Sequence, residues 1–81
     1  SILNGEYEII EAEIIETSEL INKELKNSNL PDEIRIGAIL RNEDVIIPRS
    51  NFVFKKEDIV VFLAKKDFLQ VVENMFRISS I

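Results

Sequence analysis

Apolar and polar residues alternate along Ile34–Arg41, in the middle of the chain. A period of two is typical of a β-strand with one buried face, because successive side chains of a strand point to opposite faces. The pattern predicts two faces for this strand: Ile34, Ile36, Ala38 and Leu40 on one, and Arg35, Gly37, Ile39 and Arg41 on the other.

A turn signal at Asn42-Glu43 separates this strand from a second apolar run, Val45–Ile47, and together they predict a β-hairpin. Pro48 ends the second strand, because proline has no N–H to donate to a sheet. A two-residue loop would pair Arg41 with Asp44.

The same register would pair Ile39 with Ile46. The predicted phase places both on the sheet face opposite the helices, where they need cover. We therefore expect them to form the interface of a homodimer. Self-association is also expected from the size of the chain, because 81 residues bury only a small core.

Two further segments predict strands, and a third is a weaker candidate. Tyr7–Ile15 alternates, with Ile10, Ala12 and Ile14 on one face. Ile59–Leu63 is β-branched and aromatic without alternation, which indicates a central strand covered on both faces. Phe52–Phe54 is a short apolar run that could add another strand.

Two helices are predicted. The first begins at an N-cap, Thr17 or Ser18, and ends near Lys26. The second spans Asp67–Arg77, where apolar residues recur at helical spacing. We expect the strand Tyr7–Ile15, the first helix and the strand Ile34–Arg41 to form a βαβ unit with parallel strands.

These elements predict an α+β fold of order β-α-β-β-(β)-β-α. A mostly antiparallel sheet of four or five strands would carry two packed helices, in a single domain spanning residues 1–81. The net charge of −5 argues against nucleic acid as a partner, and no apolar run reaches the roughly 20 residues that a membrane-spanning helix needs. Seven glutamates within the first 24 residues are interpreted as a solvated edge rather than a cation site.

Catalytic chemistry is not expected. The chain has no His and no Cys, which removes most nucleophile–base pairs and transition-metal sites, and its two glycines build no phosphate loop. We predict neither an enzyme, nor a metal site, nor a cofactor bound by this chain.

The remaining polar candidates are arginines. In the hairpin register, Arg49 lies across from Ile36 and close to Arg35, and guanidinium groups suit phosphate or carboxylate. We predict a site for a small anion or nucleotide at the dimer interface, formed by Arg35, Ile36, Pro48 and Arg49. The alternative is that each arginine forms an ordinary surface ion pair.

The order of these features resembles the TrkA-C domain, the C-terminal module of RCK-type regulators of potassium transport. The residues that carry the resemblance are Ile36-Gly37-Ala38-Ile39 with Arg41, then Ile46-Ile47-Pro48-Arg49, then Asp58, with Ser18-Glu19-Leu20 and Asn29-Leu30-Pro31 upstream and Val72–Ser79 downstream.

The resemblance implies a cytosolic regulatory or ligand-sensing domain of a Trk-type potassium transport system. It would be a C-terminal fragment of a longer protein, in which NAD(H) binds a preceding Rossmann domain. That protein would lie at the inner face of the cell membrane through a membrane-embedded potassium channel subunit, without inserting itself. Two alternatives are a small-molecule sensor of another transporter or antiporter, and a dimerisation module without ligand.

The chain departs from the family at turns. The family usually carries glycine at the positions of Asn22, Glu43 and Glu57, so we expect a strained hairpin turn at Glu43. Some TrkA-C domains bind c-di-AMP through an Ile-Arg-Ala type segment, and here Asn29 replaces the arginine. We therefore expect no useful binding of c-di-AMP.

Overall fold

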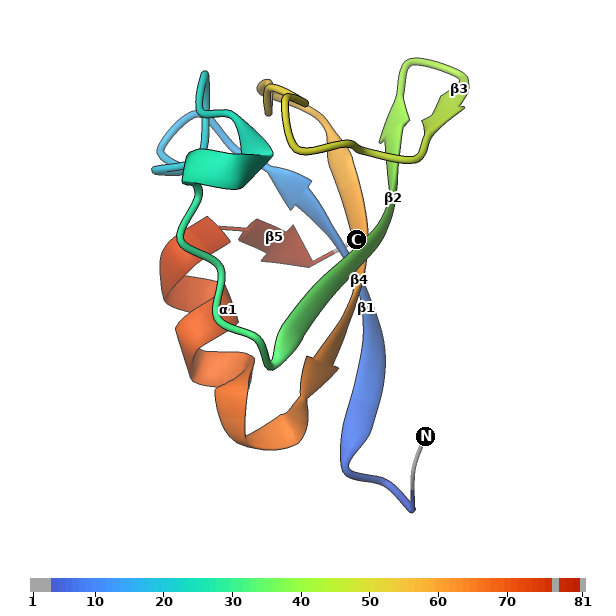
Figure 1. Ribbon diagram of the computed structural model, residues 1–81, viewed down its shortest axis with the longest axis vertical. Coiled ribbons are helices and arrows are strands. Elements are labelled where there is room, and N and C mark those ends of the chain that lie inside the picture. The colour runs from blue at the N-terminus through green and yellow to red at the C-terminus, as the bar shows by residue number, and fades with distance from the viewer. Residues whose placement is uncertain (1–3, 77, 81) are drawn as a thin grey trace.

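The computed structural model describes residues 4–76 and, for the backbone, 78–80 (Figure 1). Five strands form one antiparallel sheet in the order β3-β2-β4-β1-β5. Their bounds are β1 Tyr7–Ile14, β2 Ile34–Arg41, β3 Asp44–Ile46, β4 Ile59–Lys65 and β5 Ile78–Ser80. The chain also forms the helix α1, Leu69–Phe76, and two 3-10 turns, η1 at Leu25–Asn27 and η2 at Lys66–Phe68. The α+β class is confirmed.

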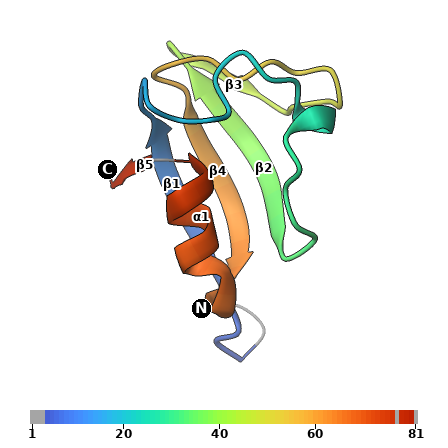
Figure 2. The same cartoon turned by 90° about the vertical axis from the view of Figure 1, so that its left-hand side faces the viewer.

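The helix α1 covers one face of the sheet, and the core lies between them (Figures 1 and 2). The rings of Phe62, on β4, and Phe76, on α1, stack with centroids 5.0 Å apart and planes 5° apart. The fully buried apolar side chains come from every layer: Ala12, Ile14, Leu20, Ile34, Ile39, Phe54, Val60, Phe62, Ala64, Val72 and Phe76.

The apolar segment Ile59–Leu63 forms most of β4, which is the central strand, as predicted. Its burial nevertheless alternates, with Val60, Phe62 and Ala64 buried and the residues between them half-buried. The prediction that both faces are covered was therefore wrong, because α1 packs on one side only.

β1 and β2 are parallel to each other, but they are not neighbours. Each pairs antiparallel with β4, which lies between them. The connection from β1 to β2 therefore crosses over β4 and does not join two neighbouring strands.

A β-bulge at Gly37 changes the faces of β2. Ile36 pairs with Phe62 and Ala38 with Val61, so Gly37 is an extra residue without a partner. A bulge adds one position and reverses the alternation beyond it. Ile39 is consequently buried in the core, and Ile46 packs against that core. The prediction that these two residues lie on the face opposite the helix was wrong.

The two-residue hairpin register is confirmed: Arg41 pairs with Asp44, and Ile39 with Ile46. The positive φ of the turn, 56°, falls on Asn42 and not on Glu43. Asparagine tolerates this conformation, so the expected strain at Glu43 is absent. The strand β3 ends at Ile46, before the predicted end at Ile47.

The first predicted helix does not form. Within residues 17–26, the hydroxyl of Ser18 accepts a hydrogen bond from the N–H of Leu20 (3.2 Å), which makes a turn, and Asn22 adopts a positive φ of 67°. The N–H groups of Asn22 and Leu25 donate to the carbonyls of Phe54 and Phe52 instead of to their own turn. The run Phe52–Phe54 likewise forms no strand, only a bridge between Val53 and Glu24.

The second predicted helix exists and is shorter. It begins at Leu69 after the 3-10 turn η2, where Asp67 lies, and it is described to Phe76. Its last predicted residue, Arg77, lies outside the described residues. The short strand β5, which pairs Ile78–Ser80 with Ala12–Ile14, was not predicted from the sequence.

Candidate functional site

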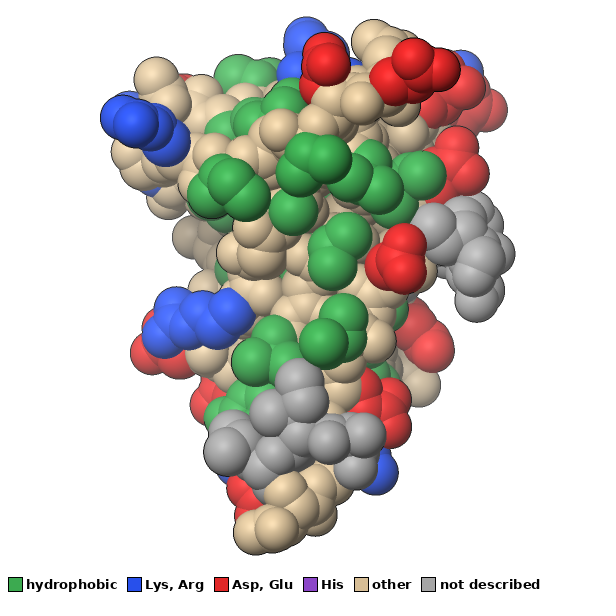
Figure 3. Space-filling model, turned by 90° about the vertical axis from the view of Figure 1, so that its right-hand side faces the viewer, with side chains coloured by type: hydrophobic (Ala, Val, Ile, Leu, Met, Phe, Trp, Pro, Cys, Tyr) green, Lys and Arg blue, Asp and Glu red, His purple; other side chains and the backbone are tan. Residues whose placement is uncertain are grey.

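Among the described residues, no helix or strand covers the sheet face opposite α1, and Figure 3 shows apolar side chains gathered across this face. Strand pairing aligns Ile9, Leu63 and Arg35 in one row across it, and Ile59, Leu40 and Val45 in another. Ile9 and Val45 keep 64% and 68% of their surface exposed. We call this the outer face: Ile9, Leu63, Val61, Ala38, Ile59, Leu40 and Val45, with Glu11 and Glu13 on its β1 side and Arg35 on its β2 side.

The bulge leaves a hollow of about 360 Å³ on the outer face. Its walls come from β1, β2 and β4: Ile9, Arg35, Ile36, Gly37, Val61, Phe62 and Leu63. A Cβ atom at Gly37 would lie 3.6 Å from the carbonyl oxygen of Val61, which is an ordinary contact distance, so this wall of the hollow has room for a small side chain. An apolar hollow of this size suits a large apolar side chain or a ring.

The four predicted ligand-binding residues are not brought together. Arg35 and Ile36 line the hollow described above and also a second hollow, described below. Pro48 and Arg49 line neither of the two. The predicted register placed Arg49 opposite Ile36, and that pairing fails because β3 ends at Ile46. The exposed Arg35 side chain instead lies 4.0 Å from Asp32, as the surface ion-pair alternative holds.

A second hollow, of about 310 Å³, lies on the other side of Arg35 and contains a cation that the sequence did not single out. Lys26 and Arg35 belong to its walls, together with Leu25, Ser28, Asn29, Leu30, Ile34 and Ile36. Two cations and the polar loop Ser28-Asn29 line this hollow, which are groups that could bind an anion. Each cation also lies near a carboxylate, Lys26 at 3.8 Å from Glu24 and Arg35 at 4.0 Å from Asp32. No sequence pattern connects Lys26 with Arg35, because the turns of residues 17–33, which the sequence did not predict, bring both to the wall of this hollow.

Arg41 and Asp58 form the best-defined polar contact of the molecule. Asp58 is 1% exposed, and its carboxylate accepts hydrogen bonds from Nε and Nη2 of Arg41, at 2.8 and 2.7 Å, and from the N–H of Lys55, at 2.9 Å. Nη2 also donates to the carbonyl of Val53 (2.9 Å). The hydrogen bond to Asp58 raises the pKa of Arg41, and burial opposes that shift only in part. The contact with the N–H of Lys55 makes Asp58 a cap of the turn before β4.

The guanidinium of Arg41 also lies over the ring of Phe52, 4.8 Å from its centroid. The Arg41–Asp58 pair therefore ties the hairpin to the loop before β4. We assign it a structural role.

Within residues 4–76 and 78–80, no group of three or more acidic side chains is arranged to hold a metal ion. None of the described helices is long and apolar enough to cross a membrane. What the geometry offers is one apolar face and small hollows with cations beside them. Among the described residues, these are the features on which association or binding could rest.

Comparison with known proteins identifies the module. The family model of the TrkA-C domain matches residues 9–77. The Trk system potassium uptake protein TrkA of Azorhizobium caulinodans is 42% identical over 79 residues, which cover 98% of this chain and 17% of that protein. The K(+)/H(+) antiporter NhaP2 of Shewanella baltica is 27% identical over 73 residues, covering 90% and 13%.

A solved RCK domain has the same fold, with a TM-score of 0.69 and 18% identity; the match covers 84% of this chain and 96% of that one. The chain belongs to the TrkA-C domain family. It spans less than a fifth of the length of the relatives it matches.

Proposed function

We propose that this chain is a cytosolic regulatory domain of a Trk-type potassium transport system. The observation that carries the proposal is the 42% identity to a potassium uptake protein along nearly the whole chain. A longer protein would contain the domain, bind NAD(H) in a preceding Rossmann domain and act on a membrane-embedded channel subunit at the inner face of the membrane.

The domain works as a homodimer in this proposal, and the outer face is the dimer interface. Two exposed β-branched side chains, Ile9 on β1 and Val45 on β3, lie at opposite corners of the outer face. Contiguous apolar patches of this kind on a small protein mark association sites. Charges favour face-to-face packing, because Arg35 of one copy can meet Glu11 or Glu13 of the other. Ile39 and Ile46 lie on the opposite face of the sheet, in the core and against it, where they hold β2 and β3 in place.

Sedimentation equilibrium tests the interface. The wild-type chain should dimerise at micromolar concentrations, and Ile9→Asp with Val45→Asp should abolish dimerisation. The matched control is Val71→Asp, an exposed apolar residue on α1, which should leave the dimer intact. A wild-type monomer at hundreds of micromolar would refute the interface.

Ligand sensing is the finer part of the proposal, and the hollow between Lys26 and Arg35 is the place we propose for it. The solved RCK domain contains cda, which supports a binding role for this fold. Without an arginine at position 29, a smaller anion such as a nucleoside monophosphate fits this chain better than a cyclic dinucleotide. A ligand that binds only the folded state raises its stability by RT ln(1 + [L]/Kd), so a thermal-shift screen detects it.

Variants assign the binding site. Lys26→Ala and Arg35→Ala should each remove the thermal shift, whereas Arg49→Ala should not. If no nucleotide or small anion shifts the transition, the dimerisation module without ligand is the better description.

The second candidate function is a sensor domain of an antiporter, favoured by the similarity to NhaP2. Measurements of ion flux in cells distinguish the potassium uptake regulator from the antiporter sensor. Cells that carry the full-length protein should lose regulated rubidium uptake when Ile9→Asp and Val45→Asp are introduced. Unchanged uptake with altered potassium–proton exchange would favour the antiporter.

A further inference from the structure

One edge of β1 has no partner strand along half of its length. β4 pairs with β1 from Tyr7 to Glu13, whereas β5 pairs only with Ala12–Ile14 on the opposite edge. Among the described residues, nothing pairs with that edge from Tyr7 to Glu11. Such an edge can accept an additional extended segment through main-chain hydrogen bonds.

The directions of the backbone groups follow from the contacts of β1. Ile14 exchanges hydrogen bonds with Asp58 (2.8 Å) and Glu57 (2.9 Å) on the β4 side, and the carbonyl of Glu6 accepts from Lys66 (2.9 Å) on the same side. Alternate residues of a strand direct their N–H and C=O groups to opposite edges. The groups of Tyr7 and Ile9 therefore point to the unpaired edge.

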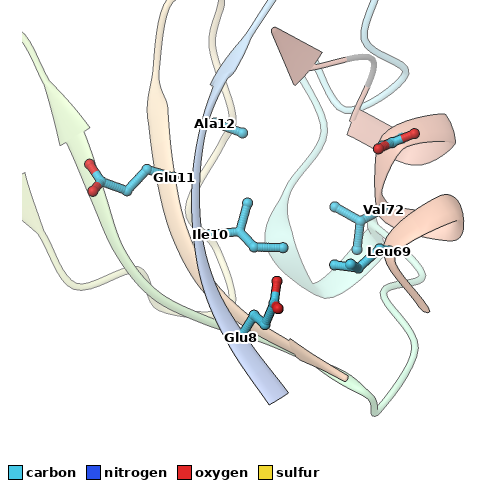
Figure 4. Close-up of a pocket in the computed structure, with 7 residues that line it drawn as sticks. Glu8, Ile10, Glu11, Ala12, Leu69 and Val72 are labelled. Atoms are coloured by element: carbon cyan, nitrogen blue, oxygen red, sulfur yellow. The ribbon is translucent and has the colours of Figure 1, made fainter. Parts of the chain in front are cut away.

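A hollow of about 310 Å³ lies between β1 and α1 beside this edge (Figure 4). Its floor is apolar, with Ile10 and Ala12 from β1 and Leu69 and Val72 from α1. The carboxylate of Glu8 lies beside the hollow, whereas Glu11 points away to the other face of the sheet (Figure 4). Glu73 of α1 also lines the hollow, so its rim is acidic. The nearest cation, Lys66, lies 3.7 Å from Glu8 in a half-exposed pair, which is a weak interaction.

An apolar floor with an acidic rim fits a lysine or arginine side chain, because its aliphatic stem covers apolar surface while its charge stays at the rim. On the other face of the sheet, an added strand would place its alternate side chains beside the exposed Ile9. The complementary segment is therefore extended, and its basic and apolar residues alternate.

A second copy of this chain fits the edge poorly. Antiparallel pairing of two β1 edges around Ile9 would place Glu8 opposite Ile10 and Glu11 opposite Tyr7. The added strand would therefore bring no basic side chain to the acidic rim, and Glu8 and Glu73 would gain no counter-charge. The occupant is thus a segment of a different, basic sequence.

We propose that the Tyr7–Glu11 edge of β1 is a docking site for an extended basic segment of a partner protein, held by strand addition and by Glu8 and Glu73. The site adjoins the outer face at Ile9, and it shares no lining residue with the hollow of Lys26 and Arg35. It does not depend on the regulatory role proposed above.

Fluorescence anisotropy with a labelled peptide that alternates lysine and valine tests the proposal. We expect a dissociation constant below about 100 µM. The same peptide N-methylated on alternate backbone nitrogens keeps its charge and loses its strand-forming edge, and it should bind at least about tenfold more weakly. A peptide that alternates glutamate and valine should not bind.

Variants of the chain provide the second arm. Glu8→Gln with Glu73→Gln should weaken binding about tenfold or more, since two charge-assisted contacts are lost. Glu19→Gln with Glu43→Gln removes the same charge from exposed positions away from β1 and should change binding less than about twofold. Equal binding of the N-methylated peptide, equal losses in the two double variants, or no binding would each overturn the proposal.

Discussion

Arg41, the last residue of β2, and Asp58, just before β4, are joined by two hydrogen bonds of 2.8 and 2.7 Å. Asp58 is fully buried, and Arg41 retains 28% of its side-chain exposure. The carboxylate receives one further hydrogen bond, from the N–H of Lys55. The pair fixes the end of the hairpin against the loop that enters the central strand.

Removing Arg41 should therefore be costly. Arg41→Ala leaves the carboxylate of Asp58 buried without its cation, and we expect a loss of about 3 kcal/mol of unfolding free energy. Urea denaturation followed by circular dichroism measures it. The control is Lys56→Ala, whose exposed pair with Glu16 should contribute less than about 0.5 kcal/mol. Similar losses in the two variants would contradict the role assigned to the pair.

Glu57 should be a site of stored backbone strain. Its φ is 74°, a conformation in which a residue with a Cβ atom is unfavourable, and its N–H must stay in place to donate to Ile14 (2.9 Å). Glu57→Gly should stabilise the chain by about 0.5–1 kcal/mol, since the relief of strain exceeds the extra entropy of the unfolded state. Thermal denaturation checks this.

The hairpin provides the matched control for that variant. Glu43 has no positive φ, so Glu43→Gly should leave stability unchanged or lower it. A destabilised Glu57→Gly variant, or an equal gain at both positions, would show that strain at Glu57 is not the cause.

Phe76 should hold α1 on the sheet. The side chain is fully buried and stacks on Phe62. Phe76→Ala should cost about 3–5 kcal/mol through lost burial and a cavity. Eight residues do not form a stable helix alone, so far-UV circular dichroism should also lose helical signal. Val71→Ala, on the exposed side of α1, is the control and should keep both stability and signal; a Phe76→Ala variant that behaves like it would refute the prediction.

The chain should not bind c-di-AMP usefully. Asn29 stands in the loop before β2 with a positive φ of 56°, and Asp32 and Glu33 follow it, so a ligand with two phosphates lacks a cation and meets repulsion. Titration calorimetry should show no binding tighter than about 10 µM. A tighter dissociation constant would overturn this prediction. Loss of such binding in Arg35→Ala or Arg49→Ala would then locate the site.

The sequence predicted most strands well, because alternation reports burial directly. β1 and the hairpin register matched, and the central position of β4 followed from its apolar composition. The faces of β2 were wrong beyond Gly37, because one bulge residue reverses every later side chain. Glycine inside a strand pattern is a recognised signal of a bulge, so this error was avoidable.

The predicted helix near Ser18 failed for a tertiary reason. Its apolar residue Leu20 is buried, but the backbone is satisfied by the loop carbonyls of Phe52 and Phe54, which are distant in sequence. Asn22, where the family usually carries glycine, was the local signal against a helix. Lys26 and Arg35 line one hollow because of that same irregular segment, so no periodic pattern in the sequence could predict that they share it.

The strand order β3-β2-β4-β1-β5 has a consequence for the order of events during synthesis. Until Ile59–Lys65 has left the ribosome, β1 has no partner, and the hairpin of β2 and β3 is the one strand pair that can form. Tyr7–Ile14 therefore waits as an apolar, strand-forming segment, the kind that aggregates with other nascent chains. Glu8, Glu11 and Glu13 keep this segment negatively charged throughout that interval. These side chains therefore reduce aggregation of the nascent chain before the folded domain exists.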